Sequence, residues 1–142
     1  MTPEHFFAER VASRMNARET VRSYYDALRA GDPLAPYVAD ERDGDDPYVK
    51  FGVSERLVGG DEIREGLRTQ TETTTDWRVT SRDLRVTERD DHAWFSDAVA
   101  MAWTDAESGR RCEFDTRWSG TLARTDGGWR FVGLHVSAAV DR

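Results

Sequence analysis

The 142-residue chain has little cysteine and no long hydrophobic run, and each shortage excludes a class of protein. Cys112 is the only cysteine, so neither a disulfide within the chain nor a cysteine-based zinc site can form. No amino-terminal apolar stretch resembles a signal peptide, and no run approaches the length of a membrane span. We therefore expect a soluble, cytoplasmic protein with no membrane partner.

Lysine is also scarce: Lys50 is the only lysine among 20 basic residues. The chain has 27 acidic residues, so its formal net charge is −7. A negative surface repels phosphate backbones, which argues against nucleic acid as a partner. Two explanations of this composition stay open. One is selection for solubility in strong salt, which screens the repulsion among carboxylates. The other is codon bias toward Arg, Ala, Gly and Asp.

The length and the apolar content predict one globular domain over residues 1–142. Hydrophobic residues make up 38% of the chain, enough for a core that needs no disulfide. No repeat, low-complexity tract or linker divides the chain. The first half reads mainly as helix, and residues from 77 onward read as strand.

Three helices are expected. Thr2 and Pro3 form a helix start and predict an extra amino-terminal helix within residues 1–16. A second helix follows Asn16 as its cap and ends at Gly31. A third is expected at about residues 61–75. The second helix has the strongest signal, an apolar spacing of i, i+3, i+4, i+7 at Val21, Tyr24, Tyr25 and Leu28.

The strand pattern predicts an antiparallel sheet. The spacing of apolar residues shifts within the segment 77–88, which predicts a bulge near Ser81. Asp-Gly-Gly at residues 126–128 is a strong hairpin signal. Helices followed by meandering strands specify an α+β fold with helices on one face of the sheet. The expected strands are 48–51, 56–58, 77–88, 93–103, 112–122 and 129–140.

The strand at residues 93–103 has no polar face. One face carries Phe95, Asp97 and Val99, and the other carries Trp94, Ala98 and further small residues. One face should pack under the helices, and the other needs a cover. A second copy of the chain is the obvious cover, so we predict a homodimer.

The carboxyl-terminal segment TLARTDGGWRFVGLHVS at residues 121–137 resembles the closing hairpin of SnoaL-like domains. Gly59 and Gly60 resemble that family's Gly-led entry into its third helix. The resemblance in element order runs from about residue 17 to residue 140. It implies the cone-shaped fold of the nuclear transport factor 2 superfamily, a curved antiparallel sheet packed by amino-terminal helices around a pocket.

The resemblance leaves the function open, because this fold hosts many activities. Its members include isomerases, cyclases, dehydratases, ligand binders and dimerisation modules. The SnoaL cyclases carry an acid–base aspartate near the end of the chain. The corresponding stretch here, residues 134–138, reads LHVSA, which speaks against a cyclase.

Asp97 and His135 are the candidate catalytic residues. Asp97 is a lone carboxylate in an apolar strand, so it is either paired or poised as a base with a raised pKa. His135 lies on an apolar final strand and is either a proton donor or acceptor in a pocket or a hydrogen-bonded core histidine. We predict that both point into the space between the sheet and the helix at residues 17–30.

Aromatic side chains are the candidate ligand-binding residues: most of them should pack in the core, and some should line the pocket. No spacing of histidines and acids indicates a metal site, and no phosphate loop or nucleophile elbow is present, so no cofactor is expected. The four aromatic candidates are Tyr24, Tyr25, Trp77 and Trp118.

Two functions therefore compete. The first is a small-molecule-binding protein for an apolar ligand, with a proton-transfer enzyme of the isomerase, cyclase or dehydratase type as its catalytic form. There Asp97 is the base and His135 orients or protonates an oxygen. The second is a non-catalytic dimerisation module with a vestigial pocket.

Overall fold

The computed structural model of the chain describes residues 15–140. The extra amino-terminal helix predicted within residues 1–16 lies outside this range, apart from its last two residues. The elements in chain order are α2 (Ala17–Ala30), the 3-10 helix η1 (Ala35–Tyr37), β1 (Val49–Phe51), β2 (Arg56–Val58), α3 (Gly60–Thr73), β3 (Thr74–Ser81), β4 (Arg85–Glu88), β5 (His92–Asp105), β6 (Arg111–Thr125) and β7 (Gly128–Ala138).

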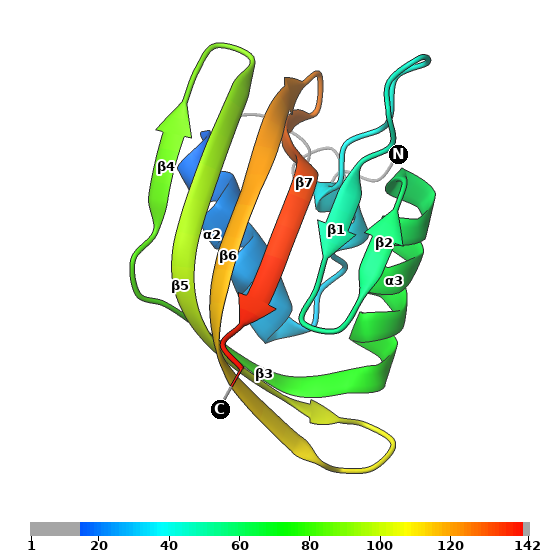
Figure 1. Cartoon of the computed structure of the whole chain (residues 1–142), viewed down its shortest axis with the longest axis vertical. Helices are drawn as coiled ribbons and strands as arrows, with labels where there is room; N and C mark the ends of the chain where they lie inside the picture. Colours follow the sequence, from blue (N-terminus) through cyan, green and yellow to red (C-terminus); the bar gives the residue numbers. More distant parts are fainter. Residues whose placement is uncertain (1–14, 141–142) are drawn as a thin grey trace, which may run out of the picture.

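The described strands form one curved, unclosed sheet in the order β2-β1-β7-β6-β5-β3, and β4 also pairs with β5 (Figure 1). Helix α2 lies across one face, and α3 runs beside the short β1–β2 hairpin (Figure 1). The predicted α+β fold is thus confirmed. One pairing departs from the prediction, because β1 runs parallel to β7.

Helix α2 forms as its sequence predicts. Asn16 and Glu19 make a reciprocal capping box at its start. Gly31 ends it with φ of 71°, a conformation that glycine adopts without steric cost. The apolar stripe of the helix is buried against the inner face of the sheet, with Tyr25 and Val21 among its most buried side chains.

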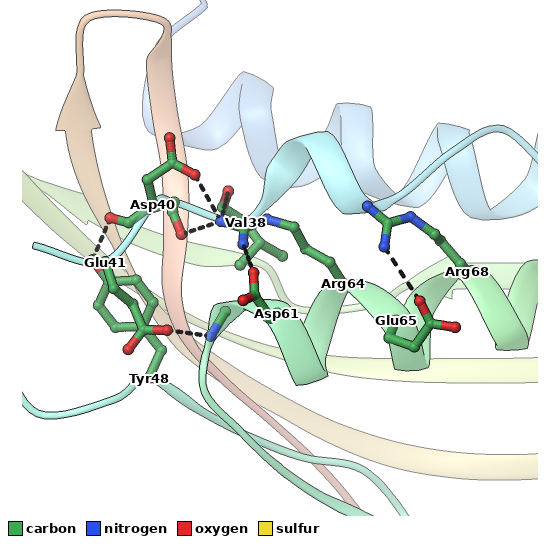
Figure 2. Close-up of polar contacts among 10 residues, drawn as sticks. Val38, Asp40, Glu41, Tyr48, Asp61, Arg64, Glu65 and Arg68 are labelled. Atoms are coloured by element: carbon green, nitrogen blue, oxygen red, sulfur yellow. Dashed lines mark hydrogen bonds and ion pairs between the residues drawn. The ribbon is translucent and has the colours of Figure 1, made fainter.

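Helix α3 starts at the glycine pair, and polar contacts surround its first turn (Figure 2). Gly59 has φ of 92°, and a Cβ on Gly60 would lie 3.0 Å from Arg64 Nη1. The Gly60 amide donates to the Glu41 carboxylate. Arg64 donates to the Ala39 carbonyl at 2.8 Å. These bonds hold the loop that follows η1 against the start of α3, so this polar cluster has a structural role.

The strand predicted over residues 77–88 is two strands. The chain leaves the sheet around Asp83, between β3 and β4. One irregular pairing lies between Thr75 and Arg78, where Asp76 has φ of 52°. A second extra residue lies between Ser81 and Arg85, which pair with Val99 and Ser96 of β5, so the irregularity predicted near Ser81 is present, as the break between the two strands. At the break, the Asp83 amide donates to the carboxylate of Asp97 on β5, which replaces a backbone carbonyl of a neighbouring strand.

Candidate functional site

A cavity of about 340 Å³ opens between the inner face of the sheet, α3 and the turn that joins β1 to β2. This volume is in the range of small-molecule sites. Tyr24 reaches it from α2, Gln70 from α3 and Val136 from β7. Much of its wall is apolar, the charged groups lie on the side of the β1–β2 turn, and α3 adds uncharged polar side chains such as Gln70.

Three stacked aromatic rings form one wall of the cavity, and we call them the aromatic ladder. The Trp77 and Trp103 rings lie 4.9 Å apart at 23°, and the Trp103 and Phe114 rings lie 5.5 Å apart at 26°. They come from β3, β5 and β6, which are neighbours in the sheet. Near-parallel rings at these distances favour offset stacking, so a flat ligand could continue the series.

Tyr24 and Trp118 contribute further to the lining. Their rings meet edge to face at 6.1 Å. The Trp118 indole nitrogen donates to Thr116 at 2.9 Å. The Tyr24 hydroxyl, in contrast, has no hydrogen-bond partner among the described residues. Burial raises the pKa of Tyr24, and the nearby Glu55 charge raises it further, so the phenol stays a neutral donor.

The opposite side of the cavity carries an ion pair between Lys50 and Glu55. Only 7% of the Lys50 side chain is exposed, against 40% for Glu55. Lys50 points inward because it alternates with Val49 and Phe51 on β1, which β2 and β7 flank. The ammonium is thus held in an apolar wall with one carboxylate as its partner among the described residues.

Sequence reasoning did not select this pair. The available signal was that Lys50 is the only lysine and lies in a strand of three residues, between apolar neighbours. Glu55 gave no signal of its own. The turn also depends on Gly52, since a Cβ there would lie 2.5 Å from Glu55 Cγ. The missing side chain leaves the room in which Glu55 folds back over Lys50.

Asp97 lies elsewhere, buried between β5, β3 and α2, and it does not line the cavity. Its Oδ2 accepts from the Tyr25 hydroxyl at 2.9 Å and from the Ser81 hydroxyl at 2.6 Å. Its Oδ1 accepts from the Asp83 amide at 2.9 Å. Burial raises the pKa of Tyr25, and the bond to Asp97 raises it further.

His135 lies on the outer face of the sheet, exposed beside Phe51 with 5.4 Å between the rings. The predicted meeting of Asp97 and His135 in one cavity is therefore wrong. The cause is an irregularity in β7, where Gly133 pairs with Thr121 but Phe131 pairs with the next residue of β6. The extra residue reverses the alternation, so Phe131 points inward while His135 points outward.

Of the six residues selected from the sequence, the structure brings Tyr24, Trp77 and Trp118 together around the cavity. Tyr25 packs beside Trp118 but bonds to Asp97. The catalytic roles of Asp97 and His135 stay predictions. Within residues 15–140, no three His, Cys, Asp or Glu side chains gather as a metal site would require. None of the described helices is long and apolar enough to cross a membrane.

The fold and the cavity define an α+β protein of the nuclear transport factor 2-like class. The family model of the SnoaL-like domain matches residues 17–141, and the chain belongs to that family. A search of curated proteins returned no match.

Solved structures show the same fold at low sequence identity. A candidate dehydratase of the nuclear transport factor 2-like family from Streptomyces avermitilis is 15% identical, with a TM-score of 0.74 over 86% of this chain and 93% of that one. A ketosteroid isomerase-like protein from Erwinia carotovora atroseptica is 19% identical, with a TM-score of 0.68 over 87% of this chain and 94% of that one. At these identities the likeness shows the fold alone.

Proposed function

We propose that the protein binds a small, flat, largely apolar molecule in the cavity. The observation that carries this proposal is the aromatic ladder, which presents parallel rings to a space of about 340 Å³. Large aromatic walls with a few polar groups at one side are typical of small-molecule sites. A cavity of this size also favours ligand binding over a dimerisation module with a filled core.

An enzymatic form of this function is proton transfer. Among the described residues that line the cavity, the ionisable ones are Tyr24, Lys50 and Glu55. Glu55 is then the carboxylate placed to take a proton from the ligand, since Asp97 lies outside the lining and is engaged by three donors. The names of the similar structures, a candidate dehydratase and a ketosteroid isomerase-like protein, agree with such chemistry.

Fluorescence titration with 2-naphthol, a flat bicyclic probe, tests the proposal. Trp103→Ala removes the middle ring of the aromatic ladder and should weaken binding about tenfold or more, because stacking and buried area are lost. Trp94→Ala is the matched control, since Trp94 is 45% exposed on the outer face. Absence of saturable quenching, or equal weakening by the two variants, would contradict ligand binding in this cavity.

The predicted homodimer remains a prediction and is compatible with ligand binding. The outer face of β5 carries exposed Trp94 and small side chains. However, Asp115 lies beside Ala100, and Arg117 lies beside Ala98, so this face is more polar than the strand alone suggests. Sedimentation at micromolar concentration should show a dimer that Ala98→Glu splits, because the change buries a charge. A monomeric wild type would refute it.

A further inference from the structure

The strongest unexplained feature of the cavity is a buried cation whose only partner among the described residues is partly in water. We infer that the natural ligand is a planar aromatic carboxylate whose carboxylate group replaces Glu55 on the Lys50 ammonium. This inference rests on the proposed function. It adds the chemical class of the ligand and the group that recognises it.

The two members of the ion pair differ in what they can do when separated. The Lys50 side chain is 7% exposed and comes from a strand held between β2 and β7, so its ammonium stays at the wall of the cavity. Glu55 is 40% exposed and lies in the β1–β2 turn, so its carboxylate can be hydrated without moving the sheet. A buried charge must stay paired, whereas an exposed one need not. Glu55 is therefore the replaceable partner.

The cavity offers an incoming carboxylate more donors than Glu55 uses. An ammonium carries three donor hydrogens, and Lys50 donates to Glu55 alone among the described residues. Tyr24 also lines the cavity and is 2% exposed, and its hydroxyl has no hydrogen-bond partner within residues 15–140. Hydrogen bonds from charged groups to carboxylates are stronger than neutral ones. A ligand without an acceptor atom would leave the Tyr24 hydroxyl and the ion pair unchanged and gain only the stacking.

The aromatic ladder sets the shape of the ligand. It lies on the β3, β5 and β6 side of the cavity, while Lys50 reaches in from β1. A rigid ring system that continues the aromatic ladder from a terminal ring, Trp77 or Phe114, would direct a ring substituent toward the ammonium. A flexible fatty acid would lose more conformational freedom on binding and gain no stacking. These contacts favour an aromatic acid.

Gly52 supports this role for Glu55. A Cβ at residue 52 would overlap Glu55 Cγ at 2.5 Å and approach Cδ at 3.0 Å, and its three nearest atoms all belong to Glu55. Gly52→Ala should therefore push the Glu55 side chain away from Lys50 without changing either charged group. The backbone of Gly52 has an ordinary φ, so the substitution itself is not strained.

Calorimetric titration with 2-naphthoate and its neutral counterpart 2-naphthamide tests the inference. The wild type should bind the acid about tenfold more tightly than the amide. Lys50→Met should abolish that preference by weakening acid binding about tenfold, and it should change amide binding less. Glu55→Gln and Gly52→Ala should each strengthen acid binding several-fold, because the competing carboxylate is neutralised or displaced. Glu65→Gln removes the same charge from the exposed face of α3 and should change nothing.

The outcomes separate the two proposals. Saturable binding of both probes with equal affinity overturns the aromatic acid and leaves the ligand-binding function standing. A preference for the acid that persists in Lys50→Met also overturns the assignment of Lys50. Failure of both probes to bind overturns both proposals, and binding of the amide alone overturns only the aromatic acid. Glu55→Gln alters a partly exposed side chain, so it provides an independent test should Lys50→Met fold poorly.

Discussion

Asp97 and Lys50 look alike in the sequence, because each is a charged residue in a largely apolar strand. In the structure their surroundings differ. Asp97 accepts hydrogen bonds from two hydroxyls and one amide, all supplied by the chain. Lys50 has one partner among the described residues, and that partner is half in water. The comparison teaches that spare bonding capacity beside a cavity, and not burial alone, marks a group that is free to act on a ligand.

The location of each site agrees with this distinction. Asp97 lies where β3 breaks off and β4 begins, and its carboxylate binds the backbone of that break. It also ties β5 to α2 through Tyr25. Lys50 and Glu55 lie on the smallest hairpin of the sheet, beside the cavity. One site joins parts of the fold, and the other faces open space.

The largest expected effect is the loss of Asp97. Asp97→Ala leaves the Asp83 amide and two hydroxyls without their acceptor and should lower the free energy of unfolding by about 3 kcal/mol. Asp97→Asn keeps an acceptor for the amide and should cost less. Urea denaturation measures both. If both variants were as stable as the wild type or more so, Asp97 would be a poised base and the comparison would fail.

High pH should lower the free energy of unfolding through the buried tyrosine at each site. Burial raises the pKa of Tyr24 and of Tyr25 above the usual 10. Each therefore contributes stability that is complete below pH 10 and is lost as pH rises further, at up to about 1.4 kcal/mol per pH unit. Urea midpoints at pH 9 and pH 11 should show this fall, and Tyr25→Phe should make it shallower. An equally steep fall in Tyr25→Phe would assign the effect to other groups.

Lys50→Met should change stability by less than about 1 kcal/mol, because the buried charge is replaced by an apolar chain of similar length and Glu55 turns to water. Arg64→Met is the matched control. Arg64 binds the Ala39 carbonyl and the Asp40 carboxylate, so its loss should cost about 1–3 kcal/mol. A larger loss in Lys50→Met than in Arg64→Met would make Lys50 structural.

Added salt should have the smallest effect on stability. It distinguishes surface charges, which salt screens, from buried ones, which it does not. With a net charge of −7, the melting temperature should rise between 0.1 and 1 M potassium chloride, as the Debye length falls from about 10 Å to about 3 Å. The cost of Asp97→Ala should not change with salt, because that site is buried. A flat or falling melting temperature would favour codon bias as the origin of the acidic composition.

The type of residue that lines the cavity could be predicted from the sequence, but not every residue that lines it. Aromatic residues were expected around a pocket, and Tyr24, Trp77 and Trp118 lie there. Trp103 and Phe114 complete the aromatic ladder and were not selected, because their stacking depends on the register of β5 against β6. Alternation along one strand cannot reveal which side chains of neighbouring strands stack.

The sequence by itself determined α2 and α3, the general order of the elements and the family. Caps, apolar spacing and turn glycines act over a few residues, so they can be read locally. Only the tertiary structure decided which ionisable groups share the cavity. One extra residue in β7 turned His135 outward, and the parallel pairing of β1 with β7 brought Lys50 beside Leu134. Such pairings join segments far apart in the chain, and a shift of one residue exchanges the faces of a strand.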